Sequence, residues 1–300
     1  MGALVDRAKG VFGPAVDAPS WSSAGTLGAL RILAGLLWLY NVSWKRPPDF
    51  GEDSGKGLFR FTHDAVDHPV LAPYSWVVEH LVLPNFQAFG WTVLAVETTL
   101  AVLLLTGTMV RVAAALGVAQ STAIALSVAQ TPGEWPWSYW MMIGIHVVLL
   151  GGAAGAVLSV DRVRAAPRAG RRLLASWGVV VGGTACIVLV MSVGESATAA
   201  SGARLGGPDL SISLGSYNLL GAIVLLAVAV LMLVAASARR SEFALLAAAL
   251  AVVAALSLYI QLGFSDPLLG GSNTSAAFFL CAAVVAAACS RRLSVPTEES

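Results

Sequence analysis

Two ionisable residues lie deep inside apolar segments of the sequence, and their types suit proton transfer. Glu97 stands seven residues past Gly90 in WTVLAVETTLAVLLLTG, and His146 stands eight residues past Ser138 in SYWMMIGIHVVLL. At about 1.5 Å per residue, each lies roughly 10–12 Å from the start of a helix. A charge in lipid is costly and needs a partner. We therefore expect Glu97 and His146 to face each other and to form a catalytic pair.

Polar and aromatic residues in other segments could complete a pocket around this pair. Trp38 and Asn41 are three residues apart and share a helix face. Quinone reduction needs proton donors for two carbonyl oxygens and an aromatic wall for the ring, which predicts a quinone headgroup as the ligand. We expect its binding residues to be Trp38, Asn41, Lys45 at the mouth, Arg46, Glu79, His80 and Trp140. The alternative is a Glu–His or Glu–Asn hydrogen bond that only holds the bundle together.

The remaining polar clusters favour structural roles. Arg31, Arg111 and Asp161 lie near segment ends and are expected to form structural ion pairs. A weak metal-site candidate is the H-D-x-x-D-H run, which contains His63, Asp64, Asp67 and His68 but matches no strong zinc spacing. We predict no metal site, and we expect the three cysteines, Cys186, Cys281 and Cys289, to be small buried packing residues.

The composition identifies the environment in which these residues act. The 300-residue chain is 57% apolar and only 12% charged, with a mean hydropathy of +0.78. Soluble domains carry about 45–50% apolar and about 25% charged residues. A soluble enzyme is therefore excluded, and a net charge of +1 also argues against nucleic acid as a partner. The expected partner is a lipid bilayer.

Eight apolar segments are long enough to be membrane-spanning helices, which predicts an all-α polytopic bundle. They cover about 25–43, 89–107, 110–130, 138–160, 173–193, 214–237, 242–263 and 274–290. Of the 18 basic residues, 13 fall on one side of this topology and 5 on the other. The positive-inside rule then places both termini in the cytoplasm, as an even number of spans requires.

The basic segment 161–172 divides the chain into four helices plus four. We expect a cytoplasmic segment 1–20, a four-helix domain 21–165, a second four-helix domain 166–292 and a tail 293–300. The two halves could be a duplication. The long outer loop between the first two spans, about 44–88, contains PYSWVVEHLVLPNF, whose length suits an interfacial or re-entrant helix.

Three motifs of the first half resemble the DoxX/DoxD family of membrane proteins. They are RILAGLLWLYNVSWK (31–45), PNFQAFGWTVLAVETTLAVLLLTGTMVR (84–111) and GGAAGAVLSVD (151–161). The resemblance covers about 25–161. The matching residues by position are Arg31, Trp38, Lys45, Glu97, Arg111 and Asp161.

The resemblance implies a membrane subunit of a thiosulfate:quinone oxidoreductase in the plasma membrane of a prokaryote. Such a subunit passes electrons from thiosulfate to membrane quinone and works with a separate redox subunit. Quinone would be a substrate, and we predict no bound metal, haem or flavin. Whether the chain is catalytic alone, and whether it forms a homo-oligomer, stays open.

Two other functions remain as alternatives. Small-residue runs such as GGAAGAVLS allow close helix contacts and would suit a non-catalytic scaffold or assembly factor of a redox complex. A repeated four-helix unit with a buried Glu and His would suit a proton-coupled transporter.

Overall fold

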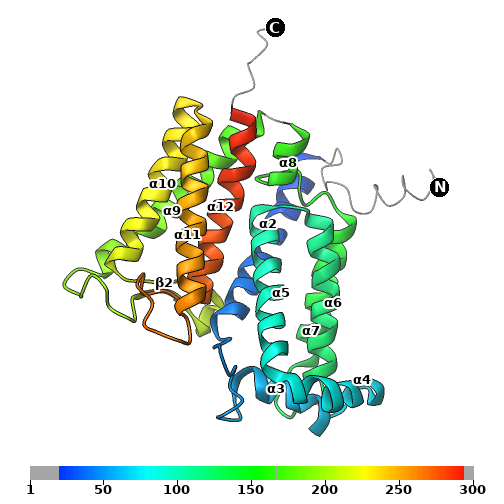
Figure 1. The fold of residues 1–300 in the computed structure, drawn as a ribbon. Helices are drawn as coiled ribbons and strands as arrows, with labels where there is room; N and C mark the ends of the chain where they lie inside the picture. Colours follow the sequence, from blue (N-terminus) through cyan, green and yellow to red (C-terminus); the bar gives the residue numbers. More distant parts are fainter. Residues whose placement is uncertain (1–19, 167, 294–300) are drawn as a thin grey trace.

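The computed structural model describes residues 20–166 and 168–293, and nearly all of its regular structure is helical (Figure 1). The first half contains α2 (Trp21–Ser43), α3 (Gly57–Asp67), α4 (Ala72–Val77), η1 (Val78–Val82), η2 (Leu83–Asn85), α5 (Phe86–Thr106), α6 (Val110–Val128), α7 (Pro136–Gly151) and α8 (Val160–Ala165). The second half contains α9 (Ala169–Met191), β1 (Ala203–Gly207), η3 (Pro208–Leu210), β2 (Ile212–Tyr217), α10 (Leu219–Ala238), α11 (Ser241–Gln261) and α12 (Asn273–Leu293).

Within the described residues, seven helical segments are long and apolar enough to cross a bilayer. They include α2, α6, α9, α10, α11, α12 and the continuous segment Ala72–Thr106, which ends in α5. The chain is therefore a multi-pass membrane protein. The eighth predicted span corresponds to α7, which packs against α6 but has only 16 residues, or about 24 Å of helix.

Two predicted span boundaries are wrong. The span expected to reach residue 160 ends at Gly151, because two consecutive glycines weaken the helix and Gly152 is extended. The span expected to begin at residue 214 begins at Leu219, after the N-cap Asn218. Residues 212–217 instead pair antiparallel with 203–207, and the alternation in ISLGSY is typical of a strand.

Each half has its own hydrophobic core, and α12 contributes to both. Figure 1 shows α12 between α9 and α11 on one side and α2 and α5 on the other. Its small side chains let neighbouring helices approach closely. Cys281 packs in the core of the first half and Cys289 in that of the second. The prediction of a buried cysteine was wrong for Cys186, which is exposed on α9 beside the outward-facing Ile187.

The connection between α2 and α5 forms a helical layer across one end of the bundle (Figure 1). This layer consists of α3, α4 and η1, and α3 contacts both α6 and η1. The helix predicted within the loop 44–88 is present as α4 with η1. Its Trp76 and Leu81 are both 56% exposed, as expected of a helix that lies in a membrane interface.

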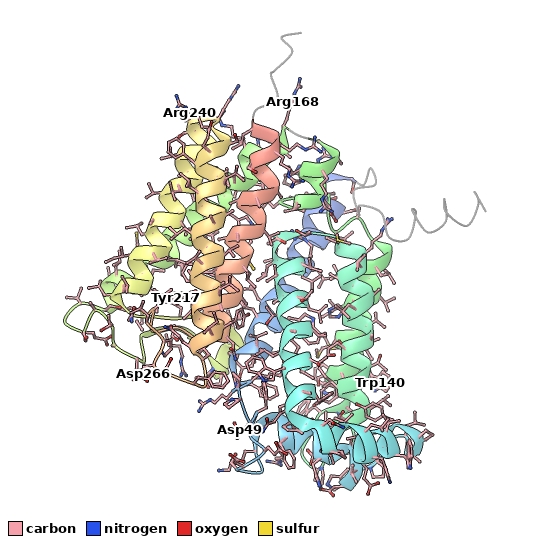
Figure 2. All side chains as sticks on the ribbon, in the orientation of Figure 1. Asp49, Trp140, Arg168, Tyr217, Arg240 and Asp266 are labelled. Carbon is pink, nitrogen blue, oxygen red and sulfur yellow. The ribbon has the colours of Figure 1, made fainter. Side chains whose placement is uncertain are left out.

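Charged residues mark the two ends of the bundle (Figure 2). Arg168 and Arg240 lie at one end, here called the basic end, and Asp49 and Asp266 lie at the opposite end. The start of α2 and the end of α12 are both at the basic end (Figure 1). The common end of α2 and α12 agrees with the predicted topology. The placement of this end toward the cytoplasm stays a prediction.

Candidate functional site

A buried ion pair joins the first two membrane helices of the first half. The Lys45 Nζ atom lies 2.5 Å from Glu97 Oε2, and both side chains are 1% exposed. Lys45 follows the end of α2, and Glu97 lies in the middle of α5, which packs against α2. Lys45 was expected at the mouth of a pocket with His146 as the partner of Glu97. The structure instead buries Lys45 and makes it the partner.

Further contacts define the electrostatics of this pair. Lys45 Nζ lies 3.6 Å from the centre of the Trp44 ring, which is a cation–π geometry. Gln120 Nε2 donates a long hydrogen bond of 3.5 Å to Glu97 Oε1. Burial lowers the pKa of Lys45 from its ordinary value, and the negative charge of Glu97 opposes this change.

A cavity of about 250 Å³ adjoins the ion pair and is partly open. The side chains around it come from α2, α3, α4, α5, α6 and α7 and from the chain segments next to α2 and α7. All of them therefore belong to the first half. Its polar wall is formed by Asn41, Lys45, Thr62, Tyr74, Glu97, Gln120, Ser127, Glu134 and Tyr139, and its aromatic wall by Trp44, Phe61 and Phe89. We call this space the ion-pair cavity.

The polar groups of the ion-pair cavity lie at two depths. The start of α5, the end of α6 and the start of α7 are all at the end opposite the basic end (Figure 1). Glu97 is about 16 Å along α5 from that end, and Gln120 is about 12 Å along α6. Tyr139 is only about 5 Å along α7. The cavity therefore has a deep polar group around Glu97 and a shallow one around Tyr139.

The shallow group consists of two hydrogen-bonded pairs. The Tyr139 hydroxyl donates to Glu134 Oε2. Tyr74 Oη lies 2.8 Å from Ser127 Oγ and also donates to the carbonyl of Ala123. A carboxylate with a phenol, and a phenol with an alcohol, therefore line the shallow part of the cavity.

The Trp38 and His146 side chains form a hydrogen bond with each other, and neither residue lines the cavity. Trp38 Nε1 donates to His146 Nε2 at 2.9 Å, and His146 Nδ1 donates to the Met142 carbonyl at 2.7 Å. Both ring nitrogens of His146 are thus occupied, and the imidazole is neutral. Its ring lies against Gly117, where any Cβ would collide with it. The expected contact between Glu97 and His146 does not form.

The other predicted binding residues divide between the cavity and the surface. Asn41 lines the cavity and donates to the Leu37 carbonyl. The other four are exposed and do not line it: Arg46, Glu79, His80 and Trp140. Figure 2 shows Trp140 at the edge of the bundle. A tryptophan suits both a lipid interface and a ring-binding wall, and the 63% exposure of Trp140 indicates the interface.

The H-D-x-x-D-H run lies on α3, near the cavity. His63 Nδ1 is 2.9 Å from Asp67 Oδ2, and both side chains are exposed. Asp64 is buried on the same helix, and His68 is its C-terminal cap residue. Across the described parts of the chain, no group of three or more His, Cys, Asp or Glu side chains is placed to hold a metal ion.

At the basic end, a second set of buried charges bonds mainly to the backbone. Arg31 is fully buried and donates to the carbonyls of Leu104, Leu105, Val157 and Leu158. Asp161 accepts bonds from the backbone N–H groups of Met109 and Val110, and lies 3.8 Å from Arg164. Arg31 and Asp161 thus both bond to the backbone, and Asp161 also forms an ion pair with Arg164. An ion pair that includes Arg111 stays a prediction. Arg111 lies one residue further along α6 and is half-buried.

The sequence analysis missed most of the cavity lining, including the polar residues Tyr74, Gln120, Glu134 and Tyr139. Gln120 offered a usable signal, because it is a polar residue in the middle of an apolar span. Counting back from the end of that span places it near the depth of Glu97. Glu134 and Tyr74 lie in connections between spans, where sequence gives no depth.

Comparisons with protein families, curated proteins and solved structures found no match to this chain.

Proposed function

We propose that the ion-pair cavity binds the headgroup of a membrane quinone and that the chain is the membrane subunit of a quinone-linked oxidoreductase. The proposal includes eight membrane spans, with α7 as the short one, and a basic end that faces the cytoplasm of a prokaryote. The observation that carries it is a buried carboxylate–ammonium pair that adjoins a partly open cavity with aromatic walls.

The size and lining of the cavity suit a single ring. Its volume of about 250 Å³ lies just below the range of about 300–1,000 Å³ typical of pockets for drug-sized ligands. Trp44, Phe61 and Phe89 offer faces and edges for a flat ring. The isoprenoid tail of a quinone would remain in the lipid, so the cavity has to hold only the headgroup.

The two polar depths match the two oxygens of a quinone. Reduction adds two electrons and two protons, one proton at each oxygen. Lys45 and Glu97 form a deep pair that can deliver one proton, and Tyr139 with Glu134 forms a shallow pair that can deliver the other. Protons would return to the shallow pair from the nearer end of the bundle.

The electrons come, in this proposal, from thiosulfate through a partner redox subunit, as the resemblance of residues 25–161 implies. Two thiosulfate ions each lose one electron and join through a new S–S bond, which gives tetrathionate. The quinone gains those two electrons and two protons and becomes a quinol. This chain supplies the quinone site and the protons, and the partner subunit supplies the electrons.

Direct titration of the purified protein with a short-chain benzoquinone tests the site without any partner. We expect saturable binding by calorimetry in lipid nanodiscs, and a loss of at least about tenfold in affinity in Glu97→Gln, equivalent to about 1.4 kcal/mol. The matched control is Glu79→Gln, which changes an exposed carboxylate outside the cavity and should bind normally. Absence of saturable binding to the folded wild type would favour the scaffold alternative.

Thiosulfate-dependent turnover tests the donor separately. Membranes that contain the partner subunit should reduce the quinone when thiosulfate is added, and Glu97→Gln should abolish this activity. Binding without thiosulfate-dependent turnover would retain the quinone site and remove thiosulfate as the donor.

A further inference from the structure

The second half of the molecule contacts the segment that carries Lys45. Asn273, the first residue of α12, donates from Nδ2 to the backbone carbonyl of Lys45. The next residue, Thr274, donates from Oγ1 to the carbonyl of Leu39 at 3.5 Å. Both side chains are buried, so these bonds are made away from water. The start of α12 therefore holds the end of α2.

The same end of the second half also reaches the helix that carries Glu97. The Tyr259 hydroxyl of α11 donates to Thr98 Oγ1 at 3.4 Å, and Thr98 is the neighbour of Glu97. Gly263 packs so closely on the Pro47 carbonyl that a Cβ at this position would lie 2.3 Å from it. Contacts from α11, α12 and the loop between them thus flank both members of the ion pair.

Asn273 is an unusual choice for its position. Its side chain is only 5% exposed, and its Oδ1 atom has no hydrogen-bond partner. A buried amide oxygen without a partner costs free energy, which a small apolar residue would avoid. The bond that the amide does make is the one to the Lys45 backbone. An energetic cost at Oδ1 together with a hydrogen bond from Nδ2 to the Lys45 backbone is expected of a residue whose role is to position Lys45.

We infer that Asn273 is a positioning residue for the Lys45–Glu97 pair, and that the α11–α12 end of the second half fixes the geometry of the ion-pair cavity. This inference gives the last four helices a role in the site, although none of their residues lines the cavity. Its effect on ligand affinity rests on the proposed function. Its effect on the ion pair does not, and can be measured without a ligand.

Infrared spectroscopy of the ligand-free protein measures the ion pair directly. The carboxylate band of Glu97 is identified by its loss in Glu97→Gln. In Asn273→Ala we expect this band to shift. The Lys45 backbone loses the hydrogen bond that holds it in place, so the distance from the Lys45 ammonium to the Glu97 carboxylate changes. The matched control is Ser275→Ala, which removes a buried hydroxyl from the same turn of α12. Its bonds to the Ser216 backbone stay within the second half, so the Glu97 band should not move.

Quinone affinity supplies a second readout through a double-mutant cycle. Asn273→Ala should weaken binding about tenfold in the wild-type background and less than about twofold in a Lys45→Met background, because it acts through Lys45. A purely structural role would weaken binding equally in both backgrounds. If Asn273→Ala does not fold, Tyr259→Phe removes one hydroxyl beside Thr98 and should also shift the Glu97 band.

The outcomes separate the inference from the proposed function. An unchanged Glu97 band in a folded Asn273→Ala protein would overturn the inference, whatever the ligand. A shifted band in a protein that binds no quinone would support the positioning role and overturn the quinone site.

Discussion

The first half of the molecule contains two buried charged clusters that use their charges differently. At the basic end, Arg31 bonds to four backbone carbonyls and Asp161 to two backbone amides. At the opposite end, Lys45 and Glu97 bond to each other beside a cavity. Backbone groups cannot move without unfolding a helix end. Two side chains, in contrast, can break the bond between them and bind a ligand instead. The comparison teaches that burial alone does not mark a site. A binding site is indicated when buried charged side chains bond to each other and lie beside a cavity.

The largest effect is expected at the basic end. Arg31→Met would leave several buried carbonyls without donors, and such losses reach about 4–5 kcal/mol. We expect the variant to accumulate poorly and to unfold at a much lower temperature in detergent. Arg31→Lys should rescue little, because a single ammonium cannot reproduce the planar guanidinium fork. A stable Arg31→Met protein would contradict the structural role given to this cluster.

The ion pair should behave in a different way when both partners are changed. Lys45→Met or Glu97→Gln alone leaves an uncompensated buried group and should destabilise the protein by about 3–5 kcal/mol. The double variant should recover much of that stability, since replacing a buried pair by uncharged groups is often neutral. It should still not bind quinone. The test compares the unfolding midpoints of the two single variants and the double variant. A double variant as unstable as the single variants would count against the ion pair.

Two glycines, one packed against Arg31 and one in open space, test how much the close packing around Arg31 contributes to stability. Gly107 has φ of +66°, and a Cβ there would lie 2.3 Å from Ser159 Cβ and 2.4 Å from Arg31 Nη1. Gly133 has φ of +88°, with nothing within 4 Å of such a Cβ. Gly133→Ala should cost about 1–3 kcal/mol from backbone strain alone, and Gly107→Ala should cost more. Similar losses in both would show that close packing around Arg31 contributes little.

The smallest effect on quinone affinity is expected at the Trp38–His146 pair. Trp38→Phe keeps most of the buried ring and removes one hydrogen bond, which leaves His146 Nε2 without its donor. The cost should be about 1–3 kcal/mol. Quinone affinity should stay within about twofold of the wild type, because neither residue lines the cavity. A loss of affinity as large as that of Glu97→Gln would restore His146 to the binding site.

The class of the fold could be predicted from the sequence, because the lengths of the apolar segments and the positions of the basic residues are both set by the lipid bilayer. Seven of the eight predicted spans meet the length of a membrane helix, and α7 falls short where Gly151 and Gly152 end it. The hairpin 203–217 was missed because residues 214–217 of its second strand were assigned to the apolar span that follows. The strand alternation was visible only over six residues.

The candidate site was predicted in part. Glu97, Lys45 and Asn41 were selected by type and depth, and all three line the cavity. The pairing of Glu97 was wrong because depth along a helix does not give rotation about its axis. His146 shares the depth but faces Trp38 and Gly117. Asn273 could not be found from sequence, since its role depends on a contact between residues 228 positions apart.

Photoaffinity labelling with an azidoquinone tests the central claim most directly. Peptide mapping of the labelled protein in lipid should find the adduct on cavity residues of α3 and α6, such as Phe61 and Ile124. Excess unmodified quinone should prevent this labelling, and Glu97→Gln should reduce it. Labelling confined to lipid-facing residues such as Val179 and Ile187, and insensitive to competition, would contradict the account.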